Sequence, residues 1–367
     1  MRYSIAKIKR ISIVFLLISF VGFVNESKAA ESEGEFSPKD MILHHVKDAY
    51  GMHIATLNFS NMDPLHITIP LPVIIYTDSG LTIFSSSLFH HDYHGHTIVE
   101  KDGIKLVNLH EKVYVLDQGS DSLELDAEGH PLNASRPIFD LSVTRNVLMM
   151  WVSIVLLLLI FLSSAKSYKK SKKFVPSGLA SFVEPLILFV RDEIGRPMIG
   201  DRKYKPYMPY LLTIFFFIWI NNIFGLIPIL NGANLSGNIS FTFTLATVTF
   251  IITTLSGNKN YWKHIFWMPG LPVPMKLFLM PIEIIGMFVK PISLMIRLFA
   301  NITAGHVIIL ALMSLIFVFK SVAIAPISIA FSLFITVIEI IVTAIQAYIF
   351  TILSALYFGM ATEEEHH

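Results

Sequence analysis

The sequence predicts an all-α polytopic membrane protein with about five mature membrane helices, a tilted C-terminal helix hairpin among them, and a small exported N-terminal domain. Its 367 residues are 53% hydrophobic and only 15% charged, with a mean hydropathy of +0.62. Such a composition is too apolar for a soluble globular protein. The second observation is a series of long apolar runs between residues 146 and 367, because each run could cross a bilayer.

Charge and cysteine content exclude several functions. The net charge of +1 gives no indication of a nucleic-acid partner, so any functional charge must be local. The chain has no cysteine, which excludes disulfides, thiolate metal sites and cysteine nucleophiles. We also find no G-x-x-x-x-G-K-[ST] loop, so no nucleotide site is expected.

Residues 1–29 are expected to be a signal peptide. Basic residues precede the apolar run Ile11–Val24, and the small-residue site Ser27-Lys28-Ala29 follows it. The run is short for a membrane span, so the mature chain is expected to begin near Ala30. An uncleaved first membrane helix is the alternative.

Residues 30–145 are expected to form the exported domain, because their composition is polar and rich in turns. The strand-like stretches Val73–Tyr76 and Leu81–Phe84 flank the turn Asp78-Ser79-Gly80. The histidine-rich segment 90–96 could hold Zn or Cu, since closely spaced imidazoles are natural ligands of both. A solvated loop near the membrane surface is the alternative interpretation.

The membrane domain is expected at residues 146–367. Val147–Ala165 is uncharged and long enough to cross a hydrocarbon core of roughly 30 Å at about 1.5 Å per residue. A lysine cluster follows it, which marks the cytoplasmic side and places the preceding domain outside. Met208–Leu230 is then expected to cross outward, and Ile239–Ser256 to return to the basic loop at Lys259 and Lys263.

Between the first two spans, residues 178–204 mix apolar and charged positions. Pro185 and Pro197 are expected to break any helix there. We therefore expect segments that lie along the membrane surface.

The C-terminal region contains ionisable residues within apolar sequence. Between Ser321 and Met360 the only charge is Glu339, and a single helix of that length would be about 60 Å long, so it must be tilted or bent. The preceding run, Leu277–Phe319, carries Glu283, Lys290 and Arg297, with kinks expected at two prolines, Pro281 and Pro291. Ionisable residues inside a membrane cost several kcal/mol each and are candidates for an ion pathway.

Helical spacing places these residues on two polar stripes. Glu283, Lys290 and Arg297 are seven residues apart and Asn301 follows four later, while the second stripe consists of Glu339, Thr343 and Gln346. Two polar stripes on adjacent hydrophobic helices indicate an aqueous or partner-facing seam. The alternative is a helix pair held by buried hydrogen bonds and salt bridges, such as one between Arg297 and Glu339.

Three segments resemble the a subunit of the ATP synthase Fo sector. The signature helix Pro291–His306, which reads PISLMIRLFANITAGH, contains the Arg-Leu-Phe-x-Asn core of that family. The segments Glu339–Phe350 and Asn221–Pro228, and the tail beginning at Met360, are also similar. The resemblance covers the chain from about residue 141 to the end, but not the signal-like start or most of the exported region.

This resemblance implies a non-catalytic stator subunit of a bacterial inner membrane, with the N-terminus periplasmic and the C-terminus cytoplasmic. It would conduct protons through two half-channels to and from a c-ring, so that the proton motive force drives ATP synthesis. The implied partners are the c-ring, the b subunit stalk, the rest of the complex and the lipid membrane, with no cofactor and no nucleic acid. The implied proton-translocating residues are Arg297, Glu339, His306, Gln346, Asn301, Glu283, Ser293 and Lys290.

One departure concerns His306 and Glu339. Many bacterial relatives carry Glu and His at these positions in the opposite order, and the reciprocal exchange suggests that the two act together in the half-channel open to the outside. Three other functions were weighed: a sodium-coupled version of the same subunit, a membrane-anchored metal-binding protein, and a secondary transporter. The last is disfavoured because the chain shows no convincing internal repeat.

Overall fold

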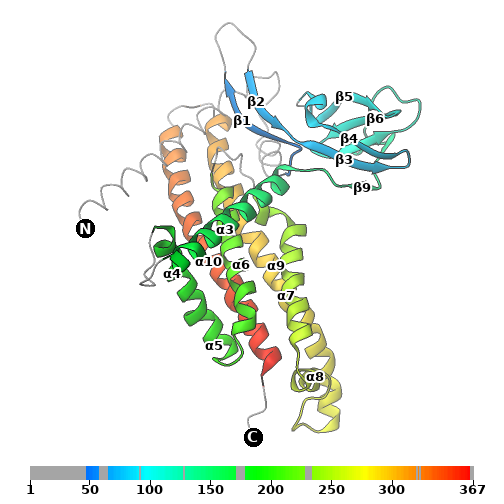
Figure 1. Ribbon diagram of the computed structural model, residues 1–367. Coiled ribbons are helices and arrows are strands. Elements are labelled where there is room, and N and C mark those ends of the chain that lie inside the picture. The colour runs from blue at the N-terminus through cyan, green and yellow to red at the C-terminus, as the bar shows by residue number, and fades with distance from the viewer. Residues whose placement is uncertain are drawn as a thin grey trace, which may run out of the picture. The chain divides into compact units, whose positions relative to one another are not determined.

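The computed structural model describes residues 47–57, 65–90, 92–126, 129–170, 178–227, 234–319, 321 and 324–363 (Figure 1). The expected signal peptide lies outside the described residues. The chain forms two compact units, one consisting of Met1–Met149 with the short segments Phe224–Ala233 and Met313–Ala325, the other of the remaining membrane helices.

The first unit contains a domain of antiparallel strands. The hairpin of β1 (Gly51–Leu57) and β2 (Leu65–Pro70) is two-stranded. A three-stranded sheet has the order β4-β3-β9, and a four-stranded sheet the order β5-β6-β7-β8. The bounds are β3 Pro72–Thr77, β4 Gly80–Ser85, β5 His94–Lys101, β6 Ile104–Leu109, β7 Val113–Leu116, β8 Ala134–Ser135 and β9 Phe139–Asp140.

The two strands predicted from the sequence are confirmed. Val73–Tyr76 and Leu81–Phe84 lie within β3 and β4, which pair in a register that sets Ile75 opposite Thr82. Gly80 has φ +112°, a conformation that side chains rarely adopt, and it closes the turn between the strands. Alternate residues of both strands point into a common core, where Val73 and Ile75 are fully buried.

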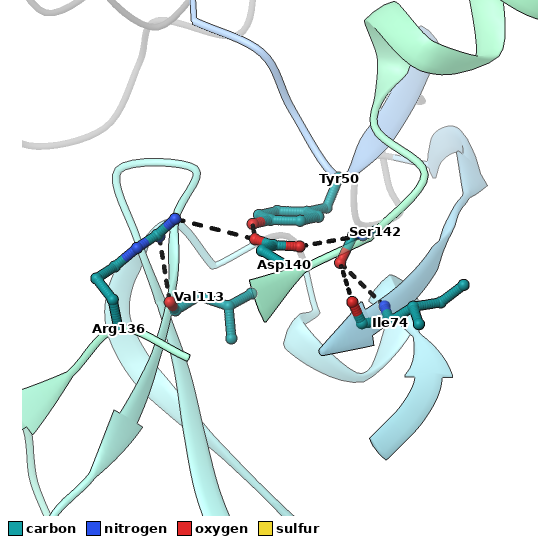
Figure 2. A network of polar contacts seen from close by, with 6 residues as sticks. All are labelled: Tyr50, Ile74, Val113, Arg136, Asp140 and Ser142. Carbon is teal, nitrogen blue, oxygen red and sulfur yellow. Dashed lines mark hydrogen bonds and ion pairs between the residues drawn. The ribbon is translucent and has the colours of Figure 1, made fainter. Parts of the chain in front are cut away.

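A polar network fastens β9 to the rest of this domain (Figure 2). The buried Tyr50 hydroxyl donates to Asp140 Oδ2 at 2.5 Å, and the other carboxylate oxygen accepts the Ser142 amide at 3.1 Å. Arg136 forms an ion pair with Asp140 at 4.0 Å and donates to the Val113 carbonyl at 3.2 Å. Burial and the neighbouring carboxylate raise the pKa of Tyr50, so its hydroxyl remains a donor at neutral pH.

From Arg145 onward the described chain is mainly helical. The bounds are α3 Arg145–Lys170, α4 Leu179–Phe189, the π-helical η2 Val190–Gly195, α5 Arg196–Ile199, α6 Met208–Gly225, α7 Ile239–Ser256, α8 Lys259–Phe266, α9 Val273–Val318 and α10 Ala325–Thr362. Among the described residues five helices are long and apolar enough to span a membrane, which confirms the expected number. These five membrane-span candidates correspond to α3, α6, α7, α9 and α10.

The sequence predicted helix breaks at Pro185 and Pro197, and only kinks at Pro281 and Pro291. Pro281 and Pro291 lie inside α9, and Pro185 lies inside α4, so none of them ends a helix. The helix break predicted at Pro185 was therefore wrong. Membrane-protein helices tolerate proline because neighbouring groups satisfy the backbone carbonyl that it frees. Pro197 lies in the first turn of α5, and the backbone runs helically from the π-helical turn into α5, so the break predicted there was also wrong.

The core of the helical unit is formed by residues of α3, α4, η2, α5, α6, α9 and α10. One face of α9 contributes Leu294 and Leu298, and α10 contributes Phe350 and Phe358, all buried. The Phe358 ring stacks on Tyr207, just before α6, with centroids 4.9 Å apart, so that α10 lies beside α6 (Figure 1). This packing determines which side of α9 and α10 faces inward.

The C-terminal end of α10 is held by backbone contacts. Lys203 Nζ donates to the Thr362 carbonyl at 2.6 Å, and the backbone N–H of Asn258 donates to the Ala361 carbonyl at 3.0 Å. Gly359 packs so closely that a Cβ there would overlap the Met198 carbonyl oxygen. The register of α10 is therefore fixed near its end.

Candidate functional site

Arg297 lies on the outer face of α9. Leu294 and Leu298, which flank it around the helix, are 1% and 0% exposed, whereas Arg297 is exposed. With Ser293 it lines an open depression of about 320 Å³ whose other walls are Val289, Ile292 and Ile296. The guanidinium therefore stands in an apolar surround on a surface open to a partner.

The residues that the structure describes include no hydrogen-bond or ion-pair partner for Arg297. The salt bridge to Glu339, weighed as an alternative from the sequence, is absent among these described residues. The two side chains lie in different surroundings, since Arg297 is exposed whereas Glu339 is buried, with 3% of its surface exposed.

Asn301 and Gln346 join α9 to α10. Asn301 Nδ2 donates to Gln346 Oε1 at 2.8 Å. Gln346 is 1% exposed, and its Nε2 has no partner among the described residues. The spacing in the sequence placed these residues on two separate polar stripes, and the structure brings them together one turn from Arg297.

Glu339 is buried between the same two helices. Both of its carboxylate oxygens lack a hydrogen-bond partner among the described residues. A Cβ built on Gly305 would come within 2.5 Å of Glu339 Oε1, so the carboxylate lies directly against the α9 backbone beside the half-buried His306. An ionised carboxylate without a partner is heavily penalised in an apolar interior, so this position favours a group that takes up a proton.

Lys290 borders a second, smaller space. Its Nζ lies 5.9 Å from the centroid of the Tyr357 ring, a cation–π geometry. Both residues line a cavity of about 20 Å³, which is large enough for roughly one water molecule. The other lining residues are Thr249, Phe250, Thr253, Tyr261, Met287, Pro291 and Met360.

The sequence interpretation missed the polar residues around this cavity. Tyr210 and Thr249 share a hydrogen bond of 2.7 Å, and Thr249 lies 3.5 Å from the Ser354 hydroxyl. A signal was present, because Thr242, Thr249 and Thr253 are spaced by seven and four residues on α7 and all are buried. Glu283, also half-buried on α9, has no hydrogen-bond or ion-pair partner among the described residues and is not brought to this cavity.

A third polar cluster lies at the end of α6. Ser236 donates to Asn222 Oδ1 at 2.5 Å, and Asn221 Nδ2 donates to the Phe217 carbonyl at 2.7 Å. Both asparagines are 1% exposed. In the sequence they were noted only as part of a motif. The bond from Ser236 shows that Asn222 holds α6 against the segment before α7, whereas Asn221 bonds within α6.

The histidine-rich segment does not assemble a metal site within the described residues, which include His90, His94 and His96 but not His91. No group of three potential ligands is found among them. Asp92 instead accepts the backbone amides of His94, at 2.8 Å, and of Thr97. Its carboxylate therefore serves the turn into β5.

A polytopic domain that exposes one arginine and buries one unpartnered carboxylate on adjacent membrane helices has the features of an ion-conducting membrane protein. The ATP synthase A chain family matches residues 147–359, and a domain of unknown function (DUF8433) matches residues 41–141. The chain therefore belongs to the ATP synthase A chain family, the proton-conducting and non-catalytic stator part of the Fo sector.

Several curated relatives are similar over most of their length. ATP synthase subunit a of Chloroherpeton thalassium is 46% identical over 235 residues, which cover 62% of this chain and 69% of the relative. ATP synthase subunit a 2 of Prosthecochloris aestuarii is 42% identical over 261 residues, or 69% of this chain and 79% of the relative. ATP synthase subunit a 2 of Chlorobaculum tepidum is 42% identical over 256 residues, which cover 68% of this chain and 71% of the relative.

Proposed function

We propose that this chain passes protons through two separate half-channels to and from a c-ring, with Arg297 between them. The observation that carries the proposal is the exposed guanidinium in its apolar depression, without a hydrogen-bond or ion-pair partner among the described residues. A carboxylate on a passing ring helix would be penalised in this surround if it were ionised and alone. Arg297 offers it a permanent positive partner, because a guanidinium does not lose its proton in proteins.

The inlet half-channel comprises His306 and Glu339, with Asn301 and Gln346 beside it. Support comes from the buried Glu339 carboxylate, whose unpartnered oxygens favour exchange of a proton rather than a fixed ion pair. The hydrogen bond between Asn301 and Gln346 fixes the two helices next to the ring-facing surface. A neutral amide pair at this place holds the structure without trapping a proton.

The outlet half-channel comprises Glu283, Lys290 and Ser293. The cavity beside Lys290 and Tyr357 supports the inclusion of Lys290, since one water there could bridge hydroxyl groups of α7 and α10. Arg297 lies seven residues along α9 from Lys290, between inlet and outlet, so that a proton reaches the outlet only after a ring helix has carried it past the arginine. Each charge that crosses 100 mV contributes roughly 2.3 kcal/mol, so several protons are needed for each ATP.

The proposal includes a topology. Residues 1–29 are a signal peptide, residues 30–145 face the periplasm, and residues 146–367 form the membrane domain of a bacterial inner-membrane subunit with its C-terminus in the cytoplasm. Its partners are the c-ring and the b subunit stalk. N-terminal sequencing of the mature chain and protease accessibility of both ends test this topology, and an intact Met1 or an external C-terminus would contradict it.

The central test is Arg297→Gln in membrane vesicles that contain the whole complex. ATP-driven proton pumping and proton-driven ATP synthesis should both be lost while the subunit remains assembled, because the substitution removes a charge from a surface and no core contact. Ile308→Ala, which shortens an exposed apolar side chain of the same helix, is the control and should pump normally. Normal pumping by assembled Arg297→Gln would overturn the proposal. Replacement of Na⁺ by choline separates proton from sodium coupling.

A further inference from the structure

The three-stranded sheet of the N-terminal domain has an apolar outer face. Alternation along β3 and β4 sends Val73, Ile75 and Phe84 into the core, and their neighbours outward. The outward residues, which we name the apolar sheet face, are Ile74, Tyr76, Leu81, Ile83 and Phe139. Apart from the half-buried Ile74 they are well exposed, between 45% for Tyr76 and 63% for Phe139.

Strand register gathers these side chains into one patch. Ile74 pairs with Ile83, and Tyr76 pairs with Leu81 on one side and with Phe139 on the other. Directly paired side chains on one face of a sheet lie about 4.5–5.5 Å apart at Cβ. The patch therefore extends without interruption across all three strands.

This composition is unusual for the water-facing side of an antiparallel sheet, which normally carries polar residues. The same domain supplies the comparison, because the exposed positions of β5 are His94, His96 and Glu100. Contiguous exposed apolar patches indicate contact with another protein or with a membrane. The position of this patch along the chain, close to the first membrane helix, favours contact with a membrane over contact with another protein.

The sheet leads directly into the first membrane helix. Beyond β9 the chain continues to pair with β3, since the Leu141 amide donates to the Ile74 carbonyl at 2.9 Å and the Val143 amide to the Pro72 carbonyl at 3.0 Å. Helix α3 begins at Arg145, four residues after Leu141, a distance of at most about 14 Å. The apolar sheet face is thus tethered next to the point where the chain enters the bilayer.

The first residues of α3 are hydrogen-bonded to the N-terminal unit. The backbone N–H of Arg145 donates to the Ala49 carbonyl at 2.9 Å, and the backbone N–H of Asn146 donates to Asp48 Oδ1 at 3.1 Å. Burial raises the pKa of Asp48, against the opposing effect of the hydrogen bonds that it accepts. At β9 itself the network around Asp140 holds the strand against the domain core (Figure 2).

We propose that the apolar sheet face of this domain docks on the lipid bilayer into which α3 inserts. Leu81 and Ile83 bury their side chains at the boundary of headgroups and acyl chains, while the aromatic rings of Tyr76 and Phe139 occupy the headgroup level that such rings favour. Because α3 already anchors the chain, docking is intramolecular in effect and a small patch suffices. The proposal holds on whichever side of the membrane the domain lies.

The test uses the absence of cysteine from the chain. Ile83→Cys and, as a matched control on the polar strand, Glu100→Cys are labelled with an environment-sensitive nitrobenzoxadiazole dye. The full-length subunit in its complex is reconstituted in vesicles of phosphatidylethanolamine and phosphatidylglycerol, with or without phosphatidylcholine that carries a spin label on its acyl chain. We expect blue-shifted emission at position 83 and several-fold stronger lipid quenching there than at position 100.

The other outcomes contradict the proposal. Blue-shifted emission without lipid quenching would mean that protein covers the face, either residues 1–46 of this chain, a second copy or another subunit. Unshifted emission would mean that the face is open to water. A second variant, Leu81→Glu in the Ile83→Cys background, should abolish the quenching because a carboxylate resists burial in lipid, and persistent quenching would also overturn the proposal.

Discussion

The carboxylate of Glu339 on α10 lies directly against the backbone of Gly305 on α9. An ideal Cβ at Gly305 would stand 2.5 Å from Oε1, 2.9 Å from Cδ and 3.2 Å from Cγ of the glutamate. Only a residue without a side chain leaves this space, so Gly305 determines where the buried carboxyl group can be. A methyl group at Gly305 would displace the end of the flexible Glu339 side chain first, and not a backbone atom. A substitution there should therefore affect proton flux more than folding.

Gly305→Ala should therefore preserve assembly and reduce proton flux. The methyl group pushes the Glu339 carboxylate aside, and misplacement of a reacting group by about 1 Å can cost on the order of 10²-fold in rate. The fold should tolerate the change, since Gly→Ala inside a helix is favourable by roughly 0.5–1 kcal/mol. Proton pumping is measured in vesicles at matched subunit levels.

Two further variants control this result. Gly286→Ala, also on α9, meets no atom of the described chain within 4 Å and should pump like the unmodified protein. Glu339→Asp in the Gly305→Ala background shortens the side chain by one methylene and should recover part of the lost flux. Equal flux in Gly305→Ala and Gly286→Ala would show that the position of the carboxylate is unimportant.

Gly359→Ala should have the opposite phenotype. Its Cβ would overlap the Met198 carbonyl oxygen, and a backbone group cannot rotate away as a side chain can. We expect loss of packing at the end of α10, with a cost of at least the 1–3 kcal/mol that is typical of overpacking. Immunoblotting of membranes should show reduced subunit levels, and normal levels of this variant would contradict the close packing of α10 on α5.

Helix positions were largely predictable from hydropathy, and α7 has the predicted bounds Ile239–Ser256. The first span extends from Arg145 to Lys170 rather than from Val147 to Ala165, because hydrogen bonding continues through polar residues at which an apolar pattern stops. The nine strands described in the N-terminal domain were harder to predict. Only the pair around the Asp78-Ser79-Gly80 turn had clear alternation, since strand pairing is decided by residues far apart in sequence.

The candidate site was predictable as two stripes but not as contacts. Spacing gives the angle of each residue on its helix, and Arg297 and Asn301 differ by only about 40°. It does not tell which neighbour faces that angle. Packing of Leu294 and Leu298 into the core turns Arg297 outward, while Asn301 still reaches Gln346. The role of Gly305 followed only from the position of Glu339.

The hydrogen bond between Asn301 and Gln346 should give a small coupling energy. Interhelical hydrogen bonds in membrane proteins average about 0.6 kcal/mol, less than expected for buried groups in general. Asn301→Ala, Gln346→Ala and the double variant complete a cycle measured by unfolding of the detergent-solubilised protein. We expect the double variant to lose about 0.6 kcal/mol less unfolding free energy than the sum of the two single losses. Strictly additive losses would show that the two amides do not interact.

Tyr50→Phe should loosen β9 without unfolding the domain. The substitution leaves the Asp140 carboxylate short of one buried donor, at a cost of roughly 1–3 kcal/mol. Hydrogen exchange of the Leu141 and Val143 amides, which bond to β3, should accelerate accordingly. Tyr76→Phe, which removes an exposed hydroxyl from the same domain, is the matched control, and equal exchange rates in the two variants would contradict the proposed importance of the network.

The last prediction concerns His306 and Glu339 as one coupled proton relay. Glu339→Gln keeps size and hydrogen-bonding capacity but removes the titrating carboxyl group, so a loss of flux reports on proton transfer more than on packing. His306→Ala should slow proton uptake from the other side of the relay. His306 follows Gly305, the residue against which the Glu339 carboxylate lies, so a change at either position acts on the same short segment of the interface.

The reciprocal double variant, His306→Glu with Glu339→His, restores one carboxyl group and one imidazole in the opposite order. If the two positions cooperate, its flux should exceed the value expected from the added losses of the single variants His306→Glu and Glu339→His, because each new residue again has a titrating partner. Flux is measured in vesicles at matched subunit levels for the singles and the double, with Gly286→Ala as the reference for an uninvolved change on α9. Losses that simply add would show that the positions act independently, and the inlet half-channel would then have to be assigned to other residues.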